Sequence, residues 1–134
     1  MTTTLFTDIS AALNSRLATL ASPPPIDWPN TDYIPIEGIT FIRPRLLPSS
    51  GALFTIAGSY LNAGIYQISI FCPINTGTQN CTNLLNQLQQ LYSVNKTLVS
   101  NNTTVYIQDI IEGKSQRENA WYSGYIEIHY ICYS

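Results

Sequence analysis

The chain has 134 residues, enough for a single domain with a real hydrophobic core. Only 10% of the residues are charged, against roughly 25% in typical soluble domains, and the formal net charge is -2. This balance gives no general attraction to phosphate backbones, so static binding of DNA or RNA is not expected. Uncharged polar residues must supply the surface, and desolvating them costs less than desolvating unpaired charges, which favours self-association.

No segment is as long and apolar as a membrane helix, and residues 1–8 lack the basic start of a signal peptide. We therefore expect a protein made and kept in a cytosol, with no membrane partner. Cys72, Cys81 and Cys132 are odd in number and form no Cys-x-x-Cys motif. We expect them to be reduced core residues, because cysteine is among the most often buried residue types.

The first predicted element is an amphipathic helix. Its apolar side carries residues at helical spacing, namely Leu5, Ile9, Leu13, Arg16, Leu17 and Leu20. The other side carries Asp8, Asn14, Ser15 and Thr19. Thr4 or Thr7 can cap the start, and the prolines of residues 23–25 end the helix because they lack N–H donors.

Residues 22–37 form a segment dense in proline that also contains Trp28 and Tyr33. Disordered segments rarely carry large aromatic residues. The segment is therefore predicted to be an ordered, extended arm that lies across its own domain or across a neighbour, and not a linker between domains.

Three strands are predicted next. Residues 39–45 alternate, with Ile39, Phe41, Arg43 and Arg45 on one face, and Pro44 indicates an edge strand or a strand end. Residues 53–61 form a plausible second strand, and residues 65–72 follow the break at 62–64 as a central strand. We expect these three strands to form an antiparallel meander.

A second helix is indicated by Cys81, Leu84, Leu85, Leu88, Leu91 and Tyr92, which recur at helical spacing. Its outer face consists of uncharged amides that could meet solvent or another subunit: Asn83, Asn86, Gln87, Gln89 and Gln90. A hairpin of residues 96–99 and 105–111 follows, and a long strand at 120–133 is predicted to be central or bent. This order predicts one α+β domain over residues 1–134, with both helices on one face of an antiparallel sheet.

The sequence contains no recognisable catalytic, metal-binding or cofactor-binding pattern. His129 is the only histidine, no phosphate loop or nucleophile motif is present, and the acidic residues are scattered. We therefore do not expect an enzyme. A less favoured alternative is a small hydrolase or ligand-binding domain whose pocket is assembled from Cys132, His129 and Asp109.

Two features suggest contacts between subunits. Arg43 and Arg45 on one strand face would form either a solvated or ion-paired surface or an ion pair with an acidic residue of a neighbour. Trp28 and Tyr33 in the arm and Tyr60 near a turn are the aromatic candidates, because Tyr and Trp are enriched at interfaces. Each of these five residues also has a purely structural explanation.

The order of motifs along nearly the whole chain resembles the small phage proteins related to tail terminators. It comprises an N-terminal helix, a proline-rich stretch with Trp28-Pro29-Asn30, the strand Ile39–Arg45, the run Gly64-Ile-Tyr-Gln-Ile68, a leucine-rich helix and a closing Trp121-Tyr122 strand. The resemblance implies a virion protein of the tail or neck, made in the host cytoplasm. It implies no catalytic residues.

The function that the resemblance implies is that of a ring, usually a homohexamer, at the head-proximal end of a long tail. Such a ring ends polymerisation of the tail tube and provides the surface on which the head docks. The expected partners are other copies of the chain, the tail tube protein and head–tail connector proteins, while DNA passes through the ring without specific binding. The alternative in the same class is a neck or head-completion connector.

Overall fold

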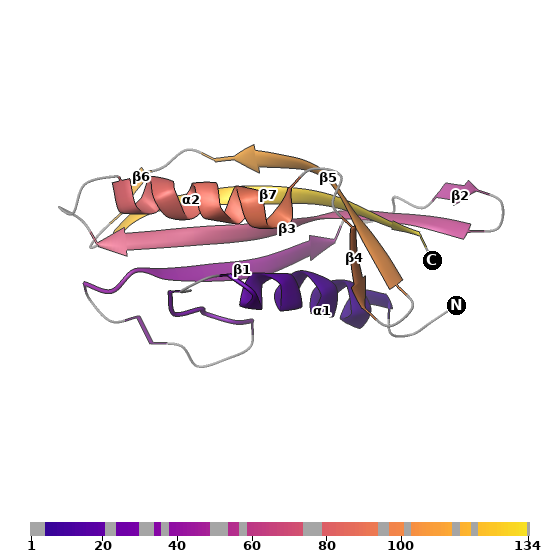
Figure 1. The fold of residues 1–134 in the computed structure, drawn as a ribbon, viewed down its shortest axis with the longest axis horizontal. Coiled ribbons are helices and arrows are strands. Elements are labelled where there is room, and N and C mark those ends of the chain that lie inside the picture. The colour runs from indigo at the N-terminus through magenta and orange to yellow at the C-terminus, as the bar shows by residue number, and fades with distance from the viewer. Residues whose placement is uncertain are drawn as a thin grey trace.

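The computed structural model describes residues 5–20, 24–29, 34–35, 38–48, 54–56, 59–73, 79–93, 97–100, 103–113, 116–118 and 121–133 (Figure 1). The helices are α1 (Leu5–Ala18) and α2 (Gln79–Tyr92). The strands are β1 (Phe41–Pro48), β2 (Phe54–Ile56), β3 (Ser59–Pro73), β4 (Thr97–Ser100), β5 (Thr103–Glu112), β6 (Gln116–Glu118) and β7 (Trp121–Tyr133).

All seven strands belong to one antiparallel sheet with the main order β1-β3-β7-β5-β4. The two longest strands, β3 and β7, form its centre and pair from Leu61 opposite Tyr133 to Pro73 opposite Trp121. The short strands β2 and β6 pair with β3 and β7 respectively. The prediction of a long central strand at the end of the chain is confirmed.

Both helices pack on one face of this sheet, which confirms the predicted α+β architecture. The even-numbered residues of β3 and β7 face the helices, and Ile68 and Ile126, which are register partners, are fully buried there. Leu13 and Leu17 of α1 and Leu88 of α2 complete the same buried cluster. The period of two in the strands and of 3.6 in the helices thus brings their apolar sides together.

The predicted three-stranded meander is wrong. Residues 62–64 do not end a strand, because β3 runs through them as a 15-residue strand paired with β7. Both β1 and β2 pair with β3, at residues 64–71 and 59–61. They therefore form successive parts of the strand that lies beside β3 in a long hairpin. The segment 49–53 between them lies outside the described residues.

Two glycines make room for tyrosines of β7, one on each face of the sheet. An added Cβ at Gly64 would lie 2.7 Å from Cζ of Tyr130 and 3.0 Å from the carbonyl oxygen of Leu47. An added Cβ at Gly113 would run into the ring of Tyr125. Gly64 therefore serves close packing inside a strand, where the sequence had suggested a break.

The two helices are joined by hydrogen bonds between α1 and the end of α2. Arg16 donates from Nε to the carbonyl oxygen of Leu91 at 2.8 Å, which satisfies a carbonyl in the last turn of α2. The buried hydroxyl of Tyr92 donates to the carbonyl oxygen of Leu13 at 2.7 Å. These bonds explain why Arg16 falls on the apolar side of α1.

The expected polar side of α1 needs a correction at Asp8 and Asn14. Asp8 is buried and accepts a hydrogen bond from the Thr103 hydroxyl at 3.2 Å. Asn14 accepts a hydrogen bond from the hydroxyl of Tyr66 at 2.5 Å. Both side chains therefore connect α1 to the sheet, whereas Ser15 and Thr19 are exposed as expected.

Replacing Tyr92 with phenylalanine is expected to lower the free energy of unfolding by about 1–2 kcal/mol, because the Leu13 carbonyl would lose a buried hydrogen bond. Chemical denaturation of both proteins measures this difference. Tyr125→Phe is the matched control, since the Tyr125 side chain is only half-buried on the face of the sheet opposite the helices, and it should change stability by less than about 0.5 kcal/mol. Equal effects of the two substitutions would contradict this account.

Three buried tyrosines predict a loss of stability at alkaline pH. Burial raises the pKa of Tyr130 to about 12, and it also raises the pKa values of Tyr66 and Tyr92. An unfolded tyrosine ionises at about pH 10, so below that pH all three tyrosines are neutral in the folded and the unfolded protein. The free energy of unfolding therefore falls as the pH rises through about 10 to 12, because the unfolded protein loses these protons first.

An ultraviolet absorbance titration of the nine tyrosines tests this. Tyr66, Tyr92 and Tyr130, whose pKa values are raised by burial, should ionise together with the loss of folded structure. A single ionisation step of all nine near about pH 10 in a protein that stays folded would contradict the prediction.

Candidate assembly surfaces

The outer edge of β1 is occupied by the chain itself. Residues 24–29 lie along it, and Ile42 donates its N–H to the Pro25 carbonyl at 3.1 Å and accepts from the Asp27 N–H at 2.8 Å. Residues 44 and 48 alternate with Ile42 and so face the same way, and both are prolines that have no N–H to offer. A further strand is therefore poorly accommodated at this edge.

Asp27 fastens this part of the arm to β1. Its carboxylate oxygen Oδ2 lies 2.7 Å from Nε of Arg43 and 3.5 Å from Nη2 of Arg45. Arg45 also donates to the carbonyl oxygen of Asp27 at 2.9 Å. Asp27 is buried while both arginines are about one-third exposed, so one enclosed carboxylate holds two cations at the surface. We call this group the Asp27 clamp.

An aromatic cluster continues from the clamp across the sheet face opposite the helices. The guanidinium carbon of Arg43 lies 4.9 Å from the ring centre of Phe71, within the range of a cation–π contact. Phe71 stacks on Phe41 with ring centres 4.7 Å apart, and Trp121 meets Phe41 edge-on at 5.2 Å. Phe41 is buried by these neighbours although it points away from the helices.

The same sheet face carries polar and ionisable residues in its middle. His129 lies opposite Asp109 of β5 and Ile65 of β3 in the sheet register. Glu127 precedes it by two residues on β7 and so lies on the same face. Nε2 of His129 is buried, lies 3.6 Å from Oε1 of Glu127 and has no hydrogen-bond partner in the structure. Among the described residues no helix packs on this face, which we call the open face.

The alternative site of Cys132, His129 and Asp109 is not assembled. Cys132 faces the helices and is fully buried, whereas His129 faces the opposite side of β7. Burial and the charge of Asp8 raise the pKa of the Cys132 thiol, which opposes formation of a nucleophilic thiolate. A Cys–His dyad therefore cannot form here, and the described residues contain no group of three potential metal ligands.

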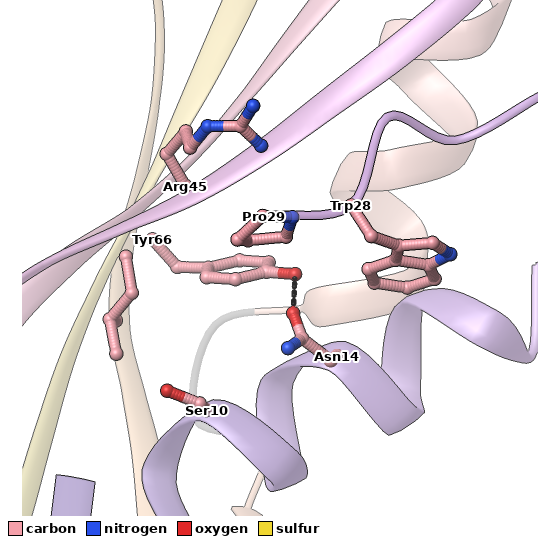
Figure 2. A pocket seen from close by; sticks show the side chains of 7 residues that line it. Ser10, Asn14, Trp28, Pro29, Arg45 and Tyr66 are labelled. Atoms are coloured by element: carbon pink, nitrogen blue, oxygen red, sulfur yellow. Dashed lines mark hydrogen bonds between the residues drawn. The ribbon is translucent and has the colours of Figure 1, made fainter. Parts of the chain in front are cut away.

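A pocket of about 470 Å³ opens between α1, the arm and the sheet (Figure 2). It is lined by Ser10, Asn14, Trp28, Pro29, Arg45, Leu46 and Tyr66. Figure 2 shows the ring of Tyr66 reaching toward α1, where its hydroxyl meets Asn14, with the indole of Trp28 beyond it. Trp28 also packs against the hydrophobic core.

The structure brings three of the five predicted contact residues together. Trp28 and Arg45 line the pocket, and Arg43 and Arg45 belong to the Asp27 clamp, so the ion-paired surface within one chain is the arrangement observed. Tyr33 lies outside the described residues. Tyr60 lies in β3 opposite Thr55, and the structure does not describe its side chain. The prediction of an interface at these residues remains a prediction.

Sequence reasoning missed Asp27 as the centre of the clamp and Tyr66 as the wall of the pocket. The available signal for Asp27 was its position beside Trp28 in an arm predicted to be ordered, since a carboxylate in an ordered segment needs a partner. For Tyr66 the alternation of β3 placed the residue on the buried side. Its polar bond to Asn14 spans residues far apart in sequence and had no local signal.

Comparison with known proteins gives a consistent result. A family model described as phage tail terminator protein matches residues 8–130. A protein of known structure, designated only by a sequence identifier, is 25% identical, with 92% of each chain covered and a TM-score of 0.75. No curated protein shows significant sequence similarity. No described helix is long and apolar enough to cross a membrane. Because the family model covers nearly the whole fold, the chain belongs to the phage tail terminator protein family, a family of structural components of the virion tail.

Proposed function

We propose that this chain forms a ring, with a homohexamer as the expected assembly, at the head-proximal end of a phage tail. The ring ends polymerisation of the tail tube and provides the surface on which the head docks. The family match over residues 8–130 carries this proposal. The proposed partners are further copies of the chain, the tail tube protein and head–tail connector proteins, and the protein is made in the host cytoplasm before it joins the virion.

The surface chemistry supports assembly through uncharged contacts. Residues 46–95, which include β3 and α2, contain no Asp, Glu, Lys, Arg or His. The exposed side of α2 carries Asn83, Asn86, Gln87 and Gln90, and amides can form hydrogen bonds across an interface without burying a charge. A stable contact between neighbours in a ring removes on the order of 800 Å² per partner from water.

The charges also support passage of DNA without specific binding. Arg43 and Arg45 share the carboxylate of Asp27, and Arg16 is directed to a helix carbonyl. The net charge of the whole chain is -2. A ring of subunits with this net negative charge has no overall excess of cations that would release counterions from DNA and bind it tightly.

Light scattering over a concentration series, first alone and then with the tail tube protein, tests the proposal. The expected result is a species of six times the 14.9 kDa of one chain, either in both samples or only beside tube protein. Tube length measured by electron microscopy should fall as the protein is added. A persistent 14.9 kDa monomer in both samples, with no effect on tube length, would contradict the proposal.

A further inference from the structure

We infer that Cys72 and Cys81 form a reversible dithiol–disulfide pair, which a small disulfide such as oxidised glutathione converts into a covalent bond between β3 and α2. Cys72 lies at the end of β3, and Cys81 lies in the first turn of α2. Both side chains are buried, and both carry free thiols in the structure. The inference goes beyond the proposed ring and does not depend on it, because the bond lies within one chain.

The fold brings these two thiols into contact. Cys72 lies opposite Tyr122 of β7 in the sheet register, and Sγ of Cys81 lies 4.0 Å from the carbonyl oxygen of the same Tyr122. Cys72 is on the side of β3 that faces the helices, and the two thiols are hydrogen-bonded to each other. A small movement of the first turn of α2 therefore brings the sulfur atoms to the separation of about 2.05 Å in a disulfide.

The surroundings give the two thiols different roles. The hydrogen bond between them lowers the pKa of Cys72 and raises the pKa of Cys81, because the Cys81 thiol donates to the sulfur of Cys72. Burial opposes the first of these effects, and a hydrogen bond with Thr40 adds to it. The thiolate is the nucleophile in disulfide exchange. Cys72 is therefore the thiol that attacks an incoming disulfide, and Cys81 is the thiol that completes the bond.

The reaction is a thiol–disulfide exchange in two steps. The Cys72 thiolate attacks one sulfur of oxidised glutathione, forms a mixed disulfide and releases one glutathione, which takes up the proton that Cys72 has lost. Cys81 then loses its proton, its sulfur attacks Sγ of Cys72, and the second glutathione leaves as a thiol. Two protein thiols are oxidised by two electrons, and one oxidised glutathione is reduced to two molecules of glutathione.

The place where the bond forms follows from the redox environment. Glutathione keeps thiols reduced in a cytosol, whereas extracellular conditions are oxidising. The pair would therefore stay reduced during synthesis and form its bond after release of the virion. Local opening of the first turn of α2 admits the oxidant, since helix ends open more readily than the core. The closed loop restricts the unfolded chain, so the oxidised protein should melt about 5–10 °C above the reduced protein.

Mass spectrometry after trypsin digestion tests for the bond in the folded protein. Residues 46–95 contain no lysine or arginine, so Cys72 and Cys81 fall in one peptide of residues 46–96, and Cys132 falls in another peptide beyond Arg117. The protein is incubated with oxidised glutathione, and its remaining thiols are alkylated in denaturant before digestion. We expect the peptide 46–96 to lose two hydrogen atoms and to regain them on reduction, while Cys132 is alkylated.

Three variants test the roles of the thiols. Cys81→Ser removes the thiol that completes the bond, so Cys72 should retain one glutathione as a mixed disulfide. Cys72→Ser should take up glutathione at least about tenfold more slowly, because the remaining thiol forms less thiolate. Cys132→Ser is the matched control, since position 132 lies roughly 30 Å along β7 from Tyr122. It should form the bond and show the same rise in melting temperature.

Several outcomes would overturn the inference. These are two alkylated thiols in the peptide 46–96 after incubation of the natural protein, a bond that forms only in urea, and a disulfide that includes Cys132 or joins two chains. Equal melting temperatures of the oxidised and reduced proteins would overturn the role of the bond in holding α2 on the sheet. A monomer that forms the bond between Cys72 and Cys81 supports this inference and contradicts the ring, so the two proposals fail separately.

Discussion

Gly64→Val is expected to lower the free energy of unfolding by about 3 kcal/mol, because a side chain at this position must enter space held by Tyr130 and the Leu47 carbonyl. Tyr130 is itself buried in the core, so its ring has little freedom to move aside. The larger side chain would force apart β3 and its neighbours at the centre of the sheet. Urea denaturation followed by circular dichroism measures the change in the unfolding midpoint.

Ala63→Val is the matched control, since Ala63 precedes Gly64 in the same strand but faces the open side of the sheet. It should cost less than about 1 kcal/mol. A double-mutant cycle with Tyr130→Leu sharpens the test, because a smaller residue at 130 should recover part of the loss caused by Gly64→Val. Strict additivity of the two substitutions would show that the clash with Tyr130 is not the cause.

Asp27→Ala is expected to lower the free energy of unfolding by about 2–3 kcal/mol, because a buried carboxylate with hydrogen bonds to charged groups is lost. Arg43 and Arg45 would be left without their shared partner, although their partial exposure lets water replace some of the interaction. Residues 24–29 would lose this ionic anchor and keep their backbone bonds to Ile42, the bond from Arg45 to the Asp27 carbonyl and the packing of Trp28 against the core. Thermal denaturation and the rate of limited proteolysis in the arm measure the two effects.

Asp109→Ala provides the control for Asp27→Ala. The Asp109 carboxylate is exposed and accepts a hydrogen bond from the N–H of the next residue, Ile110. Its removal should change stability by less than about 0.5 kcal/mol and should not speed cleavage of the arm. Equal proteolysis of the natural protein and the Asp27→Ala variant would indicate that the clamp does not hold the arm.

Much of the fold follows from periodicity. The leucines of α2 and the alternating residues of β7 repeat over many residues, and long repeats specify both the type of element and its buried side. The prediction failed at residues 62–64, because Asn62 and Gly64 are residue types that are also typical of a turn. Only the approach of Tyr130, 66 positions later, explains why a glycine belongs inside a strand there.

The candidate surfaces were less predictable because they depend on contacts distant in sequence. Alternation placed Arg43 and Arg45 on one face, but it could not choose between a partner in the same chain and one in a neighbour. The choice depends on how the arm returns to β1, and the bridge between Ile26 and Ile42 sets that path. Likewise, Asn14 fitted a solvent-facing position until the sheet placed Tyr66 beside it.

The absence of Asp, Glu, Lys, Arg and His from residues 46–95 bears on the ionic strengths that a virion meets. Screening by salt weakens attraction and repulsion between exposed charges, with a Debye length of about 10 Å at 0.1 M and about 3 Å at 1 M. A contact made by the amide side of α2 has no such charges of its own to screen. The strength of such a contact should therefore change little between dilute medium and the interior of a cell. An interface formed by the amide side of α2 would be equally stable before and after release of the virion from the host.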